Sequence, residues 1–147
     1  MVQETIIIRS PENETEWEEY FSVRYQTLRA PWHQPPGSER DEKENQAIHA
    51  AAFYNSKIIG VARLQQIEPG KGQIRYMGVL PEFNGKGIGS ALLQFLENKA
   101  KENHITSIIL NARENAVPFY IKNGYEVIEK SYLLWNEIQH YLMQKKL

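Results

Sequence analysis

Three glycines at alternate positions, Gly85, Gly87 and Gly89, stand directly before a stretch with helical apolar spacing. Glycine adopts unusual backbone angles and lets another group approach the main chain closely. Free N–H groups at the start of a helix bind anions, and the helix dipole favours negative charge there. The glycines therefore predict one of two structures: a phosphate-binding turn, or a tight turn that packs a helix close to a sheet.

Two familiar phosphate loops do not fit this stretch. The dinucleotide-binding fingerprint needs glycine or alanine three residues after its second glycine, where this chain has Ser90. A P-loop has a Gly-Lys pair followed by Ser or Thr, with another glycine five residues before the glycine of that pair. Here Gly87 follows Lys86, and Leu80 stands where the first glycine should be. Any anion bound here must therefore be held in another way.

The rest of the chain predicts a mixed α/β domain that positions this turn. Short β-branched and apolar runs predict strands, and apolar residues at 3.6-residue spacing predict helices, the first of which Asn13 or Thr15 caps. Gly78 indicates a bulge in the fourth strand, and the proline-rich segment 30–45 predicts a loop that shapes a pocket. We expect strands over residues 5–9, 47–55, 57–68, 73–80, 107–112, 125–130 and 136–146, and helices over 17–28, 88–100 and 116–123.

Composition limits the classes of function. The 147 residues suit one domain, 1–147, and a net charge of -1 gives no general attraction to nucleic acid or to an anionic membrane. The absence of cysteine excludes disulfides, thiolate metal sites and a cysteine nucleophile. No apolar run approaches the ~18 residues of a membrane span, and the N-terminus lacks the basic start of a signal peptide. We therefore expect a cytoplasmic protein.

Two blocks of sequence resemble a known family. The segment MGVLPEFNGKGIGSALLQFLENKA is similar to the signature of the GNAT superfamily of acyl-CoA N-acyltransferases, with Asn84 where Gln or Arg is usual. The segment NARENAVPFYIKNGYEV resembles a second block of that family. The resemblance covers nearly the whole chain. It implies a GNAT-like α/β fold: a twisted, mostly antiparallel sheet of about seven strands, splayed between strands 4 and 5, with helices on both faces.

The resemblance also implies acetyl-CoA as co-substrate and no metal. The pyrophosphate is expected on the N–H groups of residues 84–90, and the pantetheine arm between the splayed strands. Asn115 either contacts the cofactor amides or caps the third helix. The implied cofactor-binding residues are Met77, Gly78, Val79, Asn84, Gly85, Lys86, Gly87, Ile88, Gly89, Ser90, Asn111, Asn115, Phe119 and Tyr120.

The implied reaction is direct attack of a primary amine on the thioester in a ternary complex. The N–H of Val79 is expected to polarise the thioester carbonyl. Tyr120 is the candidate general acid for the leaving thiolate, and its alternative role is to pack the third helix on the sheet. A base must take the proton of the amine. His140 is a candidate base or acceptor contact, its alternative role being structural. The other candidate bases are His49, Glu68 and Glu137.

The sequence determines the acceptor and the residues that bind it less well than it determines the cofactor site. His33 is expected to line a pocket, while Arg75 and Arg113 either pair with acids or bind an anionic part of the acceptor. The acceptor itself stays open among a small amine, an amino acid, an antibiotic-like molecule and a protein amine. Alternative functions are a non-catalytic acyl-CoA-binding module, an interaction domain without cofactor, and a transferase of another acyl group. Neither nucleic acid nor membrane is an expected partner, and a homodimer would form through the last strand.

Overall fold

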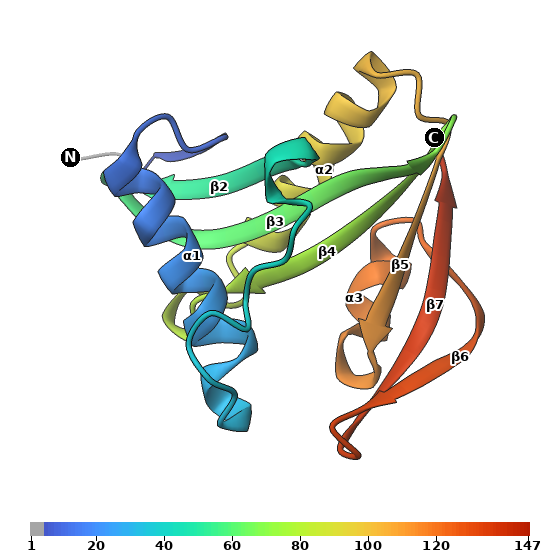
Figure 1. The fold of residues 1–147 in the computed structure, drawn as a ribbon. Coiled ribbons are helices and arrows are strands. Elements are labelled where there is room, and N and C mark those ends of the chain that lie inside the picture. The colour runs from blue at the N-terminus through green and yellow to red at the C-terminus, as the bar shows by residue number, and fades with distance from the viewer. Residues whose placement is uncertain (1–4) are drawn as a thin grey trace.

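The computed structural model describes residues 5–147, in which seven strands form one mixed sheet of order β1-β2-β3-β4-β5-β7-β6 (Figure 1). Neighbouring strands are antiparallel except for β4 and β5, which run parallel. The strands are β1 (Ile6–Arg9), β2 (Ile48–Tyr54), β3 (Lys57–Glu68), β4 (Lys71–Val79), β5 (Ser107–Arg113), β6 (Glu126–Leu134) and β7 (Ile138–Lys146). The helices are α1 (Glu14–Leu28), α2 (Ile88–Glu102) and α3 (Val117–Lys122), with short 3₁₀ turns at Ala30–Trp32, Glu44–Gln46, Pro81–Phe83 and Glu114–Ala116.

Helices cover both faces of the sheet, as expected. Helix α1 crosses β3 and β4 on one face, and α2 packs on β2 and β3 from the other (Figure 1). Because both faces are covered, strand β3 is buried continuously from Ile58 to Gln65. At the start of α1, Asn13 rather than Thr15 is the cap: its Oδ1 accepts a 2.9 Å hydrogen bond from the N–H of Glu16.

Strands β4 and β5 pair over a short stretch and then separate, which confirms the expected splay. The parallel pairing joins Lys71–Gln73 to Ser107–Ile109 and goes no further. Beyond it the two strands diverge, and β7 continues beside β5 (Figure 1). The C-terminal half of β4 therefore has a neighbour, β3, on one edge only.

The bulge expected in β4 is present, and its extra residue lies just before Gly78. Gly78 pairs with Val61, whereas Tyr76 and Met77 together face Ala62. Tyr76 has φ of 57°, a left-handed conformation that is unusual for a residue with a ring. The extra residue interrupts the register with β3, and the pairing resumes at Gly78 and Val79.

Gly78 is required for a different reason, which is close packing against α1. A Cβ atom at this position would lie 2.2 Å from Oγ1 of Thr27 near the end of that helix. No side chain fits in that space. The glycine therefore sets how closely the end of α1 approaches the end of β4.

The segment between α1 and β2 is fixed to the core by ion pairs. Arg24 on α1 is fully buried, and its Nη1 lies 2.8 Å from Glu44. Arg63 on β3 is also fully buried and contacts both carboxylate oxygens of Asp41, at 2.8 and 2.9 Å. These pairs hold residues 39–44 against the sheet, so the segment has a defined position beside β4.

The C-terminal hairpin is longer than the sequence predicted. Strand β6 was expected to end at residue 130, but it continues to Leu134, which pairs with Ile138 across the turn. Trp135 and Asn136 form that turn with φ of 51° and 55°. The longer strand carries Tyr132 to the edge of the splayed region.

Candidate active site

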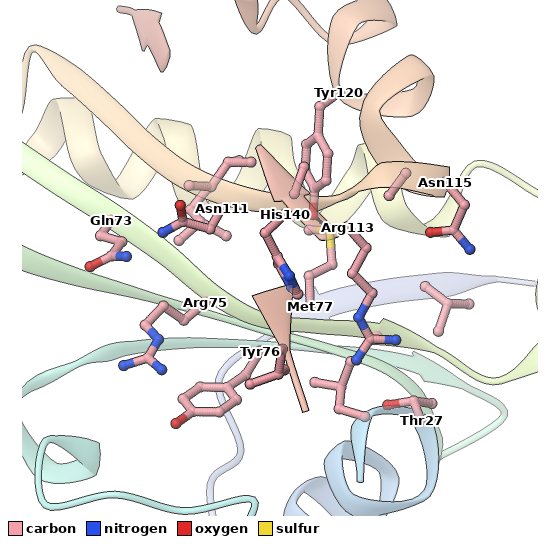
Figure 2. Close-up of a pocket in the computed structure, with 18 of the residues that line it drawn as sticks. Thr27, Gln73, Arg75, Tyr76, Met77, Asn111, Arg113, Asn115, Tyr120 and His140 are labelled. Atoms are coloured by element: carbon pink, nitrogen blue, oxygen red, sulfur yellow. Dashed lines mark hydrogen bonds between the residues drawn. The ribbon is translucent and has the colours of Figure 1, made fainter. Parts of the chain in front are cut away.

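A cavity of about 350 Å³ opens where β4 and β5 separate (Figure 2). It combines side chains from the end of α1, from both splayed strands, from α3 and from the C-terminal hairpin. The lining residues with polar side chains are Thr27, Arg29, Gln73, Arg75, Tyr76, Asn111, Arg113, Asn115, Tyr120, Tyr132 and His140. Met77, Gly78 and Val79 contribute the free edge of β4.

The exposed edge of β4 can pair with an extended ligand. The N–H of Leu80 donates to the carbonyl of Ile59 on β3, at 2.9 Å. Successive residues of a strand direct their N–H groups to opposite edges, so the N–H of Val79 points away from β3, into the gap that β5 leaves open. This orientation is the one that the expected role of Val79 requires.

The glycine turn presents unused hydrogen-bond donors at the start of α2. Within the described chain, the N–H groups of residues 85–90 donate to no acceptor, and no side chain caps the helix at Gly87. Helix α1, by contrast, has a side-chain cap. The N–H of Asn84 donates to the carbonyl of Pro81 at 3.2 Å. The set of free donors therefore starts at Gly85, one residue later than the sequence predicted.

Each of the three glycines has its own structural reason. Gly85 and Gly87 have φ of 76° and 78°, and a Cβ on either would enter open space. Gly89 lies against α3, since a Cβ there would come within 2.9 Å of the ring of Phe119. Phe119 is not among the residues that line the cavity. Its contact instead holds α3 against the start of α2, which leaves its predicted cofactor contact a prediction.

Tyr120 lines the cavity, and its role as general acid stays a prediction. Its side chain is 9% exposed, and its hydroxyl donates to Sδ of Met77 across the gap, at 3.4 Å (Figure 2). Burial raises the pKa of this hydroxyl to about 12, so it carries its proton throughout the neutral range. Its ring also packs against Phe119 and Tyr125. The packing role and a chemical role are therefore both compatible with its position.

His140 lies in the same cavity and is held in one tautomer. Its Nδ1 is 2.9 Å from the carbonyl oxygen of Ile138, which can only accept, so Nδ1 carries the hydrogen and Nε2 has a free lone pair. Burial lowers the pKa of the ring below its ordinary value, which keeps it neutral at pH 7. The ring stacks on Tyr132, with centroids 4.5 Å apart. A neutral imidazole with a free nitrogen can accept a proton.

The other candidate bases lie outside the cavity. His49 is buried against α1, where Nδ1 is 2.9 Å from the hydroxyl of Tyr20 and Nε2 is 2.8 Å from the carbonyl of Glu44. Both nitrogens are used, so its position is structural. Glu68 ends β3 at its hairpin, and the exposed Glu137 lies in the β6–β7 turn. Neither of these, nor His33, lines the cavity.

Two asparagines predicted to contact the cofactor do line the cavity. Asn111 is on β5, and Asn115 follows that strand in a 3₁₀ turn. The alternative role of Asn115 as a helix cap is wrong, because Ala116 holds the cap position of α3 and no side chain bonds to the helix start. The side chain of Asn115 therefore lines the cavity and does not cap the helix.

Sequence reasoning missed several residues of the cavity wall. Arg29, Tyr76 and Tyr132 all line it, alongside the expected Arg75 and Arg113. Tyr76 was placed in the fourth strand, but nothing in its neighbours showed that a bulge would turn it. Tyr132 lies in the part of β6 that the sequence did not assign to a strand.

Two further observations concern metals and membranes. Over residues 5–147, no group of three or more His, Cys, Asp or Glu side chains is arranged to hold a metal ion. Within the same residues, none of the helices combines the length and the apolar character that crossing a bilayer requires.

Comparison with known proteins gives the family. The model of the acetyltransferase (GNAT) family matches residues 12–125. An uncharacterized N-acetyltransferase, YjcF of Bacillus subtilis (strain 168), is 32% identical over 133 residues, which cover 90% of this chain and 94% of the relative. The chain therefore belongs to the GNAT family and is an N-acetyltransferase, as the resemblance implied.

Solved structures of the same fold include complexes with coenzyme A. An aminoglycoside 6'-N-acetyltransferase complexed with coenzyme A superposes with a TM-score of 0.81 at 15% identity, covering 97% of this chain and 96% of that one. The PaiA N-acetyltransferase of Thermoplasma acidophilum, in complex with coenzyme A, gives a TM-score of 0.75 at 20% identity, with 97% and 99% covered. At these identities the likeness establishes the fold and not the acceptor.

Proposed function

We propose that this protein transfers the acetyl group of acetyl-CoA to a primary amine by direct attack in a ternary complex. The observation that carries the proposal is the cavity between β4 and β5, in which Tyr120, His140 and the free edge of β4 meet. The uncapped start of α2 lies just past the end of that strand. A CoA molecule then has a place for its phosphates and a place for its arm.

The residues present fit the cofactor. The unused N–H groups of residues 85–90 match the oxygens of a pyrophosphate, and two of the glycines there leave open space above the main chain. The free edge of β4 offers the backbone of Val79 to the amides of the pantetheine arm as a partial extra strand. When bound, acetyl-CoA supplies an activated acyl group on a thiol that leaves readily.

Side chains of this protein then accept and donate the protons of the reaction. The amine nitrogen bonds to the acetyl carbon as the carbon–sulfur bond breaks. Nε2 of His140 accepts a proton from the amine, directly or through water, and the hydroxyl of Tyr120 donates a hydrogen bond or a proton to the leaving thiolate. The N–H of Val79 stabilises the oxygen of the acetyl group while the new bond forms. The proton that His140 takes from the amine returns through water to the phenolate of Tyr120, or to the thiolate where Tyr120 has given only a hydrogen bond, so one amine proton is lost and one thiol proton is gained overall.

Two assays test this function. Calorimetry with CoA tests whether the cofactor binds, and release of free thiol from acetyl-CoA in the presence of a panel of amines tests transfer. Binding of CoA without thiol release for any amine would favour the alternative function, a non-catalytic acyl-CoA-binding module. A panel of acetyl-, propionyl- and succinyl-CoA distinguishes the acyl group. Failure to bind CoA at all would overturn the proposal.

A further inference from the structure

Three arginines line one part of the cavity, and no carboxylate lines it with them. Arg29 comes from the end of α1, Arg75 from β4 and Arg113 from β5, so three separate elements bring their positive charges together. Neither Asp nor Glu is among the residues that form the wall. An excess of positive charge at a partly buried surface favours the binding of an anion from elsewhere.

Arg113 is the arginine with the least compensation. Its guanidinium lies 4.2 Å above the ring of Trp32, and no carboxylate of residues 5–147 is within ion-pair distance of it. Burial lowers the pKa of Arg113, and the nearby charge of Arg29 lowers it further. A guanidinium removed from water and left without a counterion gains more from an anionic ligand than an exposed one does.

The other two arginines are also short of negative charge. Arg29 donates to the carbonyls of Ser38 and Leu28, both at 3.1 Å, and these are neutral acceptors. Arg75 is 3.6 Å from Asp41, but that carboxylate is already engaged by both terminal nitrogens of Arg63. The carboxylate of Asp41 is thus shared between Arg63 and Arg75.

The arginines converge beside the candidate base. All three act electrostatically on the hydroxyl of Tyr132, whose pKa burial raises and the guanidinium charges lower. The ring of Tyr132 stacks on His140. The three guanidinium groups therefore lie around the hydroxyl of Tyr132, Arg113 also acts electrostatically on His140, and in the view of Figure 2 Arg75 and Arg113 lie to either side of that imidazole.

Arg75 lies on the opposite side of the reaction centre from the glycine turn. Along β4, Arg75 precedes Met77 and Val79, whereas the turn with the free N–H groups follows after Leu80. Each strand residue advances about 3.3 Å. A CoA molecule with its phosphates at the turn and its arm along Val79 reaches the centre from one side, which leaves Arg75 and the part of the cavity around it to the acceptor.

We propose that the acceptor is a small amine that also carries an anionic group, a carboxylate or a phosphate, which Arg29, Arg75 and Arg113 bind. This inference rests on the proposed function, because it assigns the acceptor half of the same site. A polycationic amine such as a polyamine is disfavoured, since its remaining charges would lie against three guanidinium groups without a carboxylate between them.

Binding of matched amines to the CoA-loaded protein tests the inference without requiring turnover. Two pairs differ in their anion alone: serine against serinamide for a carboxylate, and phosphoethanolamine against ethanolamine for a phosphate. Spermidine serves as the polycation. Calorimetry should show at least one amine that carries the anionic group binding tenfold or more tightly than its partner without that group, and the pair that does so identifies the anion. Partners without the anionic group binding as tightly, or spermidine binding best, overturns the inference.

Variants of Arg113 connect any preference to the cluster. Arg113→Gln should weaken binding of the amine that carries the anionic group tenfold or more, while binding of the partner without that group and of CoA is unaffected, and Arg113→Lys should restore part of the loss. Arg40→Gln removes an exposed arginine outside the cavity and is the matched control. Weaker CoA binding by Arg113→Gln with an unchanged amine preference would assign the arginine to the cofactor instead.

The failure of this inference and that of the proposed function can be told apart. If CoA binds but no anionic amine does, the inference is overturned, and the thiol-release assay with neutral and cationic amines still decides whether the protein transfers acetyl groups. If CoA does not bind, the proposed function fails first.

Discussion

The hydroxyl of Tyr120 on α3 donates to the sulfur of Met77 on β4, at 3.4 Å, across the gap that β5 leaves open. A thioether is a weak acceptor, so this hydrogen bond is easily exchanged for a stronger one. Under the proposed function, the thiolate that forms in the same gap when the thioester is cleaved is a far better acceptor. The contact with Met77 therefore directs the hydroxyl into the gap where that thiolate is proposed to form.

Replacing Tyr120 with Phe should lower kcat by about 10²-fold while CoA affinity is nearly unchanged, because the ring is kept and only the hydroxyl is lost. The effect falls at the lower end of the range for a general acid, since a thiol with a pKa near ~8.5 leaves fairly well unaided. Single-turnover kinetics of acetyl transfer measure the chemical step directly.

Tyr125→Phe is the matched control for that variant. Tyr125 is also buried, but its hydroxyl donates to Glu97 at 2.9 Å and does not line the cavity. It should lose about 1 kcal/mol of stability and keep kcat. A Tyr120→Phe enzyme with wild-type single-turnover rates would show that Tyr120 only packs α3 on the sheet.

Gly87→Val should abolish CoA binding and leave the protein folded. The φ of 78° disfavours a β-branched residue, and the added side chain would stand where the phosphates approach, although no protein atom is within 4 Å of the new Cβ. Calorimetry with CoA and the thermal unfolding midpoint together separate the two effects.

Gly37→Val provides the comparison, because Gly37 also has positive φ, at 98°, and open space around a Cβ, but lies outside the cavity and the glycine turn. It should lower the unfolding midpoint by a similar amount and bind CoA normally. If Gly87→Val binds CoA with full affinity, the assignment of the phosphates to this turn is wrong.

The pH dependence of kcat/KM should report His140. Burial lowers the pKa of this imidazole below its ordinary ~6.5, and only the neutral ring accepts a proton. Activity should therefore rise as pH increases through a value below 6.5 and then level off until other groups ionise. The loss of activity at low pH is the acid limb of the profile. His140→Gln should lower kcat and remove this acid limb, with CoA affinity retained.

An exposed histidine outside the cavity is the control for the histidine variant. His104→Asn changes a residue of φ 60°, a conformation that asparagine tolerates, and should leave the limb in place. If the acid limb persists in His140→Gln at the same pH, another group is the base and His140 is structural or an acceptor contact.

Asp41→Asn should reduce the free energy of unfolding by about 1–3 kcal/mol, because it takes the charge from the carboxylate that both terminal nitrogens of the buried Arg63 contact. That hydrogen bonding holds the pKa of Asp41 below its ordinary range in the folded state. Its contribution is therefore complete above the unfolded-state pKa of ~3.9 and is lost as pH falls toward the folded value.

Urea unfolding across the acid range measures both effects. The neighbouring Glu42→Gln changes an exposed carboxylate with no ion pair in the described structure, and it should alter neither stability nor its acid dependence appreciably. Nη1 of Arg63 also lies 3.0 Å from Glu44, so an Asp41→Asn protein as stable as the parent at pH 7 would mean that Glu44 is a sufficient counterion for Arg63.

Local pattern predicted most of the fold, and long-range contacts explain where it did not. The order of strands and helices followed from periodicity, and the glycine turn from spacing. The role of Gly78 could not be predicted, because its reason is Thr27, which lies on a helix far away in the sequence. The bulge at Tyr76 depends likewise on the register with β3.

The same reason limits what the sequence predicted of the site. Tyr120 and His140 belong to segments that carry family motifs or clear strands, so their presence in the cavity was expected. Arg29 and Tyr132 became part of the wall only because the end of α1 and the extended β6 meet there. The shortage of carboxylates around the arginines is a property of the assembled surface and has no counterpart in linear sequence.

The short pairing of β4 with β5 has a consequence for the lifetime of the protein. The two halves of the sheet are joined by three residue pairs. Under the proposed function, a CoA molecule between the strands supplies backbone hydrogen bonds that the chain itself does not make, and at 100 times its dissociation constant it adds about 2.7 kcal/mol to stability. The protein without its ligand is then the form more exposed to unfolding and proteolysis.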